Sequence, residues 1–144
     1  MRKTKVLLLC TGNSARSQMA EAFLRKYGDD RFEAYSAGLE PKDINSYTVR
    51  VMEEVGLPLD GQTSKSMAEY MGKVHFDYMI TVCADAEEKC PIVFPGMGQR
   101  LHWGFEDPAA FIGSEGETVA RFREVRDQIH GRAKGWLTGL SVTE

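Results

Sequence analysis

The stretch that most constrains the fold is residues 10–17, with the sequence Cys-Thr-Gly-Asn-Ser-Ala-Arg-Ser. Residues 6–9, directly before it, form the apolar run Val-Leu-Leu-Leu, which predicts a buried strand ending at Cys10. Residues 18–27 carry apolar side chains at helical spacing and predict a helix after the loop. A buried strand, a short loop and a helix in direct succession are typical of α/β proteins, in which parallel strands alternate with helices.

The loop at residues 10–17, called the anion loop below, is suited to binding an oxyanion. Such a Gly/Ser/Asn loop presents backbone N–H groups to one point, the start of the helix adds positive potential, and Arg16 adds a planar fork of donors. We therefore predict oxyanion binding by these residues: Thr11, Gly12, Asn13, Ser14, Ala15, Arg16 and Ser17. The same field is expected to lower the pKa of Cys10, so that a thiolate faces the anion. The alternative is an inert, buried cysteine beside a glycine turn.

Length and composition limit the class of protein. With 144 residues, 42% of them hydrophobic, the chain is expected to form a single domain over residues 1–144. The net charge of −3 argues against nucleic-acid binding, and no stretch approaches the roughly 20 apolar residues of a membrane span. The odd count of three cysteines does not suit a secreted disulfide framework, so we expect a cytoplasmic protein with catalytic or redox-active thiols. The three histidines are scattered and predict no metal site, and no cofactor is expected.

Strand and helix patterns alternate along the whole chain. Strands are predicted at residues 5–10, 32–37, 78–82 and 99–102, and helices at 17–27, 44–55, 66–71 and 114–134. This alternation predicts an α/β fold, a single-domain three-layer sandwich with a four-stranded parallel sheet and helices on both faces. Ligands of such sheets bind beyond the carboxyl ends of the strands. Cys10 and Cys83 both follow strands at such ends.

The anion loop resembles the Cys-x5-Arg-Ser loop of low-molecular-weight protein tyrosine phosphatases and of the arsenate reductases that share their fold. Cys10, Arg16 and Ser17 match the spacing of that loop in full. The resemblance covers nearly the whole chain. It implies the strand order 2-1-3-4, in which the third strand lies beside the first.

A second segment, from Cys83 to Cys90, resembles the redox segment of thioredoxin-coupled arsenate reductases. The resemblance implies two disulfides, Cys10–Cys83 as an intermediate and then Cys83–Cys90. Neighbouring strand ends lie about 4.8 Å apart, so the first bond needs little movement. Seven positions of helix would separate Cys83 from Cys90 by about 10.5 Å. A disulfide needs less than about 7 Å, so the second bond would require this segment to bend or unwind. The alternative is two inert thiols that flank a helix.

A third segment, at residues 102–109, resembles the Trp-Gly-x-x-Asp-Pro loop of the same family. That loop supplies a general acid, which corresponds to Asp107 in this chain. An acid is needed because oxygen is a poor leaving group unless it is protonated. The alternative is that Asp107 and Pro108 only start a turn.

Reductases of this family can hold a potassium ion near the anion loop with side-chain oxygens. The matching positions here are Asn13, Glu21, Ser36, Thr63 and Lys65. The family pattern has an Asp where this chain has Lys65, and an ammonium group there would repel the cation or replace it. We therefore expect no bound metal ion.

Together these resemblances imply an arsenate reductase that serves in arsenic detoxification, with weak phosphatase activity as a side reaction. Cys10 would attack arsenate, Asp107 would protonate the departing oxygen, and Cys83 would resolve the adduct. Cys90 would carry the disulfide outward to thioredoxin. Phosphate and sulfate would compete with arsenate, and a monomer without membrane or nucleic-acid partners is expected.

Two other functions stay open at this point. The chain could be a phosphatase that hydrolyses aryl phosphate esters through Cys10, although the family's phosphatases place a Tyr where this chain has Ala109. It could also be a non-enzymatic thiol redox sensor or oxyanion-binding module, which leaves Asp107 without a role. Glutaredoxin or another thiol system is an alternative to thioredoxin.

Overall fold

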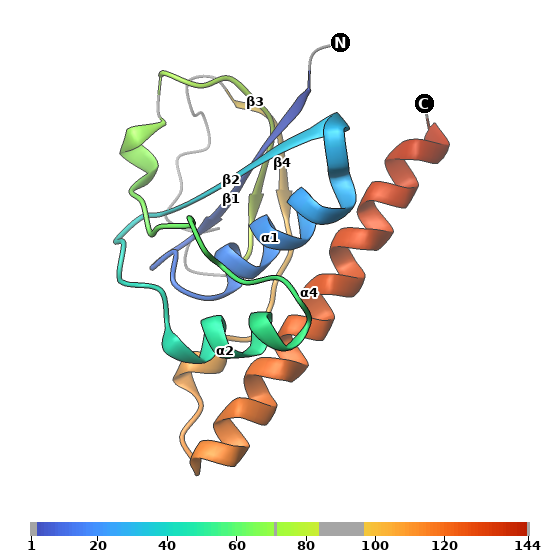
Figure 1. Ribbon diagram of the computed structural model, residues 1–144. Coiled ribbons are helices and arrows are strands. Elements are labelled where there is room, and N and C mark those ends of the chain that lie inside the picture. The colour runs from blue at the N-terminus through green and yellow to red at the C-terminus, as the bar shows by residue number, and fades with distance from the viewer. Residues whose placement is uncertain (1–2, 71, 84–96, 144) are drawn as a thin grey trace.

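The structure is a computed structural model that describes residues 3–70, 72–83 and 97–143 (Figure 1). Its sheet consists of β1 (Thr4–Cys10), β2 (Phe32–Gly38), β3 (Phe76–Thr81) and β4 (Met97–His102). Every neighbouring pair is parallel, and the strand order is β2-β1-β3-β4. The predicted α/β class, the parallel sheet and the order 2-1-3-4 are confirmed.

The described helices are α1 (Arg16–Gly28), α2 (Ser46–Glu54) and α4 (Glu115–Thr143), with short 3-10 turns η1 (Asp29–Arg31), η2 (Met67–Glu69) and η3 (Pro108–Ala110). Helix α1 packs on β1, β2 and α4, and α2 packs on α4 (Figure 1). None of the helices in the described ranges is both long and apolar enough to cross a bilayer.

Residues 6–9 of β1 are completely buried, which explains why this strand is apolar throughout. On one face of the sheet, Trp136 of α4 packs against the rings of Phe32 and Tyr78, with centroids 5.9 and 5.1 Å apart. On the other face, Tyr35 packs edge-on against Tyr70, which follows η2. The core therefore lies on both sides of β1, the strand that leads into the anion loop.

Helix α4 is longer than predicted, since it runs to Thr143 and the sequence pattern indicated an end between residues 134 and 137. Glycines at 131, 135 and 139 weaken the helical signal in this part of the sequence. Burial overrides this low propensity, because Ala133 and Leu137 lie four residues apart on the face that packs into the core. The predicted helix at 66–71 is only the 3-10 turn η2, although its capping box between Ser66 and Glu69 is present.

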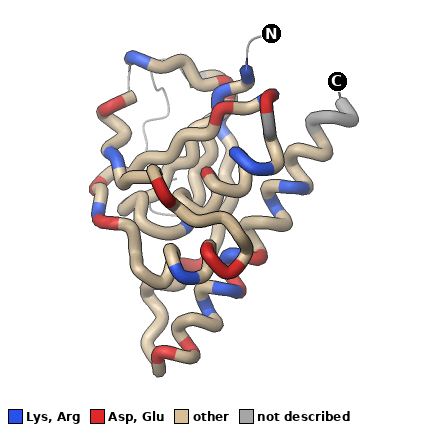
Figure 2. Tube along the Cα trace, in the orientation of Figure 1, with Lys and Arg blue, Asp and Glu red and all other residues tan. Residues whose placement is uncertain are grey.

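Basic and acidic residues lie along α4 and α2 (Figure 2), and ion pairs between the two helices hold α2 against α4. Glu54 accepts hydrogen bonds from Arg123 (2.7 Å) and from Arg126 (3.0 Å). The hydrogen bond from Arg123 is the main reason that the pKa of Glu54 is lowered to about 2, so this carboxylate is charged at neutral pH. Arg126 also donates to the backbone carbonyl of Val51 (3.0 Å) and thereby fixes the position of α2.

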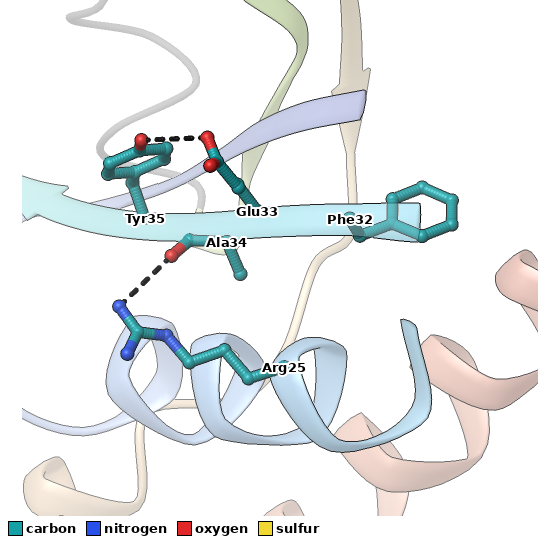
Figure 3. A pocket seen from close by; sticks show the side chains of 5 residues that line it. All are labelled: Arg25, Phe32, Glu33, Ala34 and Tyr35. Atoms are coloured by element: carbon teal, nitrogen blue, oxygen red, sulfur yellow. Dashed lines mark hydrogen bonds between the residues drawn. The ribbon is translucent and has the colours of Figure 1, made fainter. Parts of the chain in front are cut away.

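Strand β2 lies at one edge of the sheet and lines a pocket of about 360 Å³ (Figure 3). Arg25 reaches from α1 to donate to the Ala34 carbonyl at 3.2 Å, and Tyr35 donates to Glu33 at 3.1 Å. A charged side chain on a strand carbonyl opposes pairing with a further strand. We therefore interpret this pocket as part of the edge protection of β2.

The end of β2 approaches the anion loop so closely that only glycine fits. A Cβ atom on Gly38 would lie 2.6 Å from the Thr11 oxygen and 3.0 Å from the Asn13 nitrogen, both backbone atoms. We expect Gly38→Ala to lower the free energy of unfolding by about 1–3 kcal/mol, because the loop must move to admit the methyl group. Urea denaturation measures this change.

Gly131→Ala is the matched control, since a Cβ atom there meets nothing within 4 Å in the interior of α4. This variant should be more stable than the wild type, by up to about 1 kcal/mol. Equal stability of Gly38→Ala and the wild type would contradict the close approach.

Candidate active site

The backbone carbonyls of the anion loop are bonded away from its concave side. Backbone N–H groups of the segment after β2 donate to these carbonyls: Leu39 to Cys10 (3.1 Å), Glu40 to Thr11 (2.8 Å), Lys42 to Gly12 (2.8 Å) and Asn45 to Ser14 (3.0 Å). The C=O and N–H groups of a trans peptide point in opposite directions. The N–H groups that follow these carbonyls are therefore turned toward the concave side, as an anion site requires.

Asn13 fixes the turn of the loop. Its φ of 51° lies in the left-handed region, which is unusual for a residue other than glycine. Its buried side chain donates to the Ser17 hydroxyl (2.8 Å) and accepts from the backbone N–H of Lys65 (2.8 Å). The side chain of Gln18 donates to the backbone carbonyl of Asn13 (2.9 Å). The side chains of Asn13 and Ser17 thus brace the loop.

A cavity of about 590 Å³ opens over the anion loop. Its described lining consists of Cys10, Thr11, Gly12, Ser14, Ala15, Arg16, Lys42, Asp43, Asn45, Cys83, Asp107 and Ala109. Of the predicted site residues, Cys10, Arg16, Cys83 and Asp107 are therefore brought together. The predicted Cys90 lies outside the described residues, so the Cys83–Cys90 pairing and the bending of that segment stay predictions.

Arg16 connects the anion loop to the segment that carries Asp107. Its Nη1 donates to the Phe105 carbonyl (3.0 Å), and its Nη2 lies 3.7 Å from Asp107 Oδ2. Its Nε is buried and has no hydrogen-bond partner within the described part of the chain. A buried donor without a partner is costly, so this N–H group is well suited to a ligand that accepts a hydrogen bond.

Cys10 and Cys83 are both reduced and buried. The ladder between β1 and β3 continues through a hydrogen bond from Val82 N–H to the Leu9 carbonyl (2.9 Å), which brings Cys83 beside the anion loop. The Cys83 sulfur lies 3.5 Å from the hydroxyl of Thr11. The neighbouring ends of these strands thus place the two thiols in one site.

The predicted lowering of the Cys10 pKa is wrong for this reduced pair. The pKa is raised, first by a hydrogen bond with the Cys83 thiol and then by burial. Arg16 and the backbone N–H of Thr11 act in the opposite direction, as the sequence suggested. The prediction failed because it considered Cys10 beside cations and amides only, without a second thiol in contact with it.

Asp107 lies at the mouth of the cavity. One carboxylate oxygen accepts from Ala109 N–H (3.0 Å) and caps η3, and the other faces Arg16. Its side chain is 44% exposed, so the carboxyl group can exchange protons with water. Asp107 therefore starts a turn, as the alternative interpretation held, and also lines the cavity.

The sequence model of the family described as "Low molecular weight phosphotyrosine protein phosphatase" matches residues 5–143. The chain belongs to this family. The arsenate reductase of Halalkalibacterium halodurans is 43% identical to this chain over 135 residues, which cover 93% of this chain and 95% of the relative. The arsenate reductase of Bacillus subtilis is 42% identical over the same shares of the two chains.

A solved structure described as an arsenate reductase in the phosphate binding state matches this chain with a TM-score of 0.76 and 30% sequence identity. The match covers 94% of this chain and 98% of that one. The Corynebacterium glutamicum thioredoxin-dependent arsenate reductase has a TM-score of 0.73 and 25% identity, with 99% of this chain and 64% of that chain covered.

Sequence reasoning missed part of the cavity wall of this phosphatase-family fold. Lys42, Asp43 and Asn45 reach the cavity from the connection between β2 and α2, and Ala109 reaches it from η3. A signal for the first three was present, because their segment follows a strand at its carboxyl end. The local sequence does not indicate which residues of this segment pair with which residues of the anion loop.

Arg16→Lys should weaken the binding of inorganic phosphate by about tenfold or more. The substitution keeps the charge but removes the planar fork and the Nε donor, and a hydrogen bond to a charged group contributes about 1.5–3 kcal/mol. Isothermal titration calorimetry measures the affinity. Arg123→Lys, on α4, is the control and should bind phosphate as the wild type does. Equal affinities for all three proteins would show that Arg16 does not contact the anion.

The oxygens that match the potassium positions of the family are engaged in protein hydrogen bonds. Lys65 Nζ donates to the Thr63 carbonyl at 2.6 Å. Ser36 donates to one oxygen of Glu21 at 2.6 Å, and Arg25 pairs with the other oxygen at 2.8 Å. Cationic side chains thus contact oxygens at two of these positions, Thr63 and Glu21, and the absence of a bound metal ion stays a prediction.

Sodium and potassium chloride at equal ionic strength should therefore give the same melting temperature. The ammonium of Lys65 disfavours a bound cation of either kind. Thermal unfolding monitored by circular dichroism tests this, with Lys65→Asp as the variant in which a potassium-specific rise is expected. A potassium-specific rise in the wild type would contradict the prediction.

Proposed function

We propose that this protein reduces arsenate to arsenite with its own thiols. The observation that carries the proposal is that Cys10, Arg16, Cys83 and Asp107 line a single cavity over the anion loop. The similarity to arsenate reductases over 93% of the chain supports the choice of substrate. Arsenate is a tetrahedral oxyanion, which a loop of N–H groups and an arginine fork can hold.

In the first step the Cys10 thiol passes its proton to an oxygen of the bound arsenate and attacks arsenic as a thiolate, and one arsenic–oxygen bond breaks. Asp107 lies at the mouth of the same cavity and protonates the departing oxygen, which leaves as water. Arg16 supplies its buried Nε to the anion and its charge favours the thiolate. The product is a Cys10–arsenic adduct in which arsenic is still pentavalent.

In the second step the Cys83 sulfur attacks the Cys10 sulfur. The sulfur–arsenic bond breaks and its electron pair remains on arsenic, which leaves as trivalent arsenite. The two thiols are oxidised to a Cys10–Cys83 disulfide, and arsenic gains the two electrons that the sulfurs lose. This step is supported by the burial of both sulfurs in the lining of one cavity and by the contact of the Cys83 sulfur with Thr11, the residue next to Cys10, at 3.5 Å.

In the third step Cys90 attacks Cys83 and frees Cys10, and a dithiol partner reduces the resulting disulfide by exchange. The place of Cys90 in this sequence rests on its resemblance to the reductase motif. Thioredoxin is the proposed partner, supported by the similarity to the thioredoxin-dependent enzyme of Corynebacterium glutamicum. We propose that the protein acts as a single-domain monomer in the cytoplasm.

A coupled assay that follows NADPH oxidation tests this function. Arsenate with thioredoxin and thioredoxin reductase should give turnover, and glutathione with glutaredoxin should give much less. Turnover only with glutaredoxin would overturn the proposed partner and retain the reaction. Release of phosphate from aryl phosphates without any arsenate reduction would favour a phosphatase.

A further inference from the structure

Arg121, on α4, contacts the segment that carries Asp107 at two points, one before Asp107 and one after it. Arg121 Nη1 lies 3.3 Å from Glu106 Oε2. The same guanidinium lies over the ring of Phe111, 5.1 Å from its centroid. Glu106 directly precedes Asp107, and Phe111 directly follows η3. A single side chain therefore contacts the segment immediately before and shortly after the carboxyl group that faces the cavity.

The other described contacts of this segment act at different points. Its start is tied to β3 through Trp103 N–H and the Thr81 carbonyl (2.8 Å). Phe105 is held by Arg16 from the side of the anion loop, and Pro108 is buried. These contacts keep the segment docked, whereas the contacts of Arg121 with Glu106 and Phe111 set how residues 106–111 lie against α4. Arg121 also pairs with Glu124 of its own helix at 3.5 Å.

The contacts of Arg121 are suited to positioning more than to stability. The side chains of Arg121 and Glu106 are 31% and 64% exposed, and ion pairs this exposed contribute little to folding. Reaction rate is more sensitive, because a displacement of about 1 Å in a reacting group can cost about a hundredfold in rate. Losing the clamp should therefore affect the acid step more than the fold.

We propose that Arg121 is a positioning residue that holds Asp107 in place for proton transfer to the departing oxygen. It reaches neither the anion loop nor the cavity lining, so it acts through the segment it clamps. This role rests on the proposed function, since Asp107 acts as an acid only in the proposed reduction of arsenate.

Arg121→Ala tests the role in the full-length protein with arsenate as substrate. We expect kcat to fall by about tenfold while KM stays within about twofold, because the anion loop is untouched. Arg121→Lys keeps a charge near Glu106 and should recover part of kcat. Arg123→Ala is the matched control, since Arg123 lies on the same helix but pairs with Glu54 of α2, and its kcat should stay within about twofold.

Asp107→Asn supplies the background that separates positioning from a general structural effect. Once the acid is removed, Arg121→Ala should change kcat by no more than about twofold further. The same tenfold loss in both backgrounds would show that Arg121 acts elsewhere and would overturn the inference. Wild-type kcat in Arg121→Ala would overturn it as well.

A second readout does not depend on turnover. The Ala109 amide donates to Asp107 Oδ1 at 3.0 Å, so its hydrogen exchange reports where the carboxylate lies. Exchange at Ala109 should rise by about fivefold or more in Arg121→Ala and stay unchanged in Arg123→Ala. Absence of arsenate turnover in the wild type would defeat the proposed function alone, and unchanged exchange in Arg121→Ala would defeat the clamp.

Discussion

Cys10→Ser should lose arsenate turnover by more than about a thousandfold, since removal of an enzyme's nucleophile generally costs at least this much. A serine hydroxyl is far less ionised than a thiol in the same field, and it cannot form the disulfide that reduces arsenic. The NADPH-coupled assay with thioredoxin measures this loss. Replacement of a buried thiol by a hydroxyl of similar size should leave the fold intact.

Phosphate binding is the control for the Cys10 variant. The anion loop holds an oxyanion through backbone N–H groups and Arg16, so calorimetry should give an affinity within a few-fold of the wild type. Substantial arsenate turnover by Cys10→Ser would exclude Cys10 as the nucleophile.

Cys83→Ser should stop the reaction at the Cys10–arsenic adduct. The first step needs only the anion loop, Cys10 and Asp107, whereas arsenite leaves only after a second sulfur attacks Cys10. Reductive turnover should therefore fall below detection, although hydrolysis of a phosphate ester through Cys10 stays possible. Arsenite measured by liquid chromatography with elemental mass spectrometry reports this step.

Cys90→Ser is the matched variant for Cys83→Ser. With Cys83 present, it should release one arsenite per protein and then stall. Steady arsenite release by Cys83→Ser would contradict the assignment of Cys83 as the resolving thiol.

Much of this structure could be predicted from patterns among residues that are close in the sequence. The apolar run at residues 6–9 predicted β1 because a strand in the middle of a parallel sheet is buried on both faces. Capping boxes begin η2 at Ser66 and α4 at Ser114, and in both the sequence places a Glu three positions after the Ser, which is the pattern that such a box requires. The anion loop was recognised because its Cys, Arg and Ser are close in sequence, so their spacing fixes their geometry.

Contacts between distant segments were beyond the reach of local pattern. The raised pKa of Cys10 depends on a thiol 73 positions away that the sheet brings into contact. The clamp of Arg121 joins α4 to a segment 15 positions earlier in the chain. Lys42 lines the cavity because its segment pairs with the anion loop, which no periodicity reveals. Packing between elements decides each of these features.

In the proposed reaction, Cys83 attacks the Cys10 sulfur of the Cys10–arsenic adduct and arsenite leaves in the same step. Peptide mapping by mass spectrometry of Cys90→Ser, quenched in acid after one addition of arsenate without reductant, tests this most directly. We expect a Cys10–Cys83 disulfide in an amount equal to the arsenite released, and none when phosphate replaces arsenate. Arsenite release without a Cys10–Cys83 disulfide would contradict it.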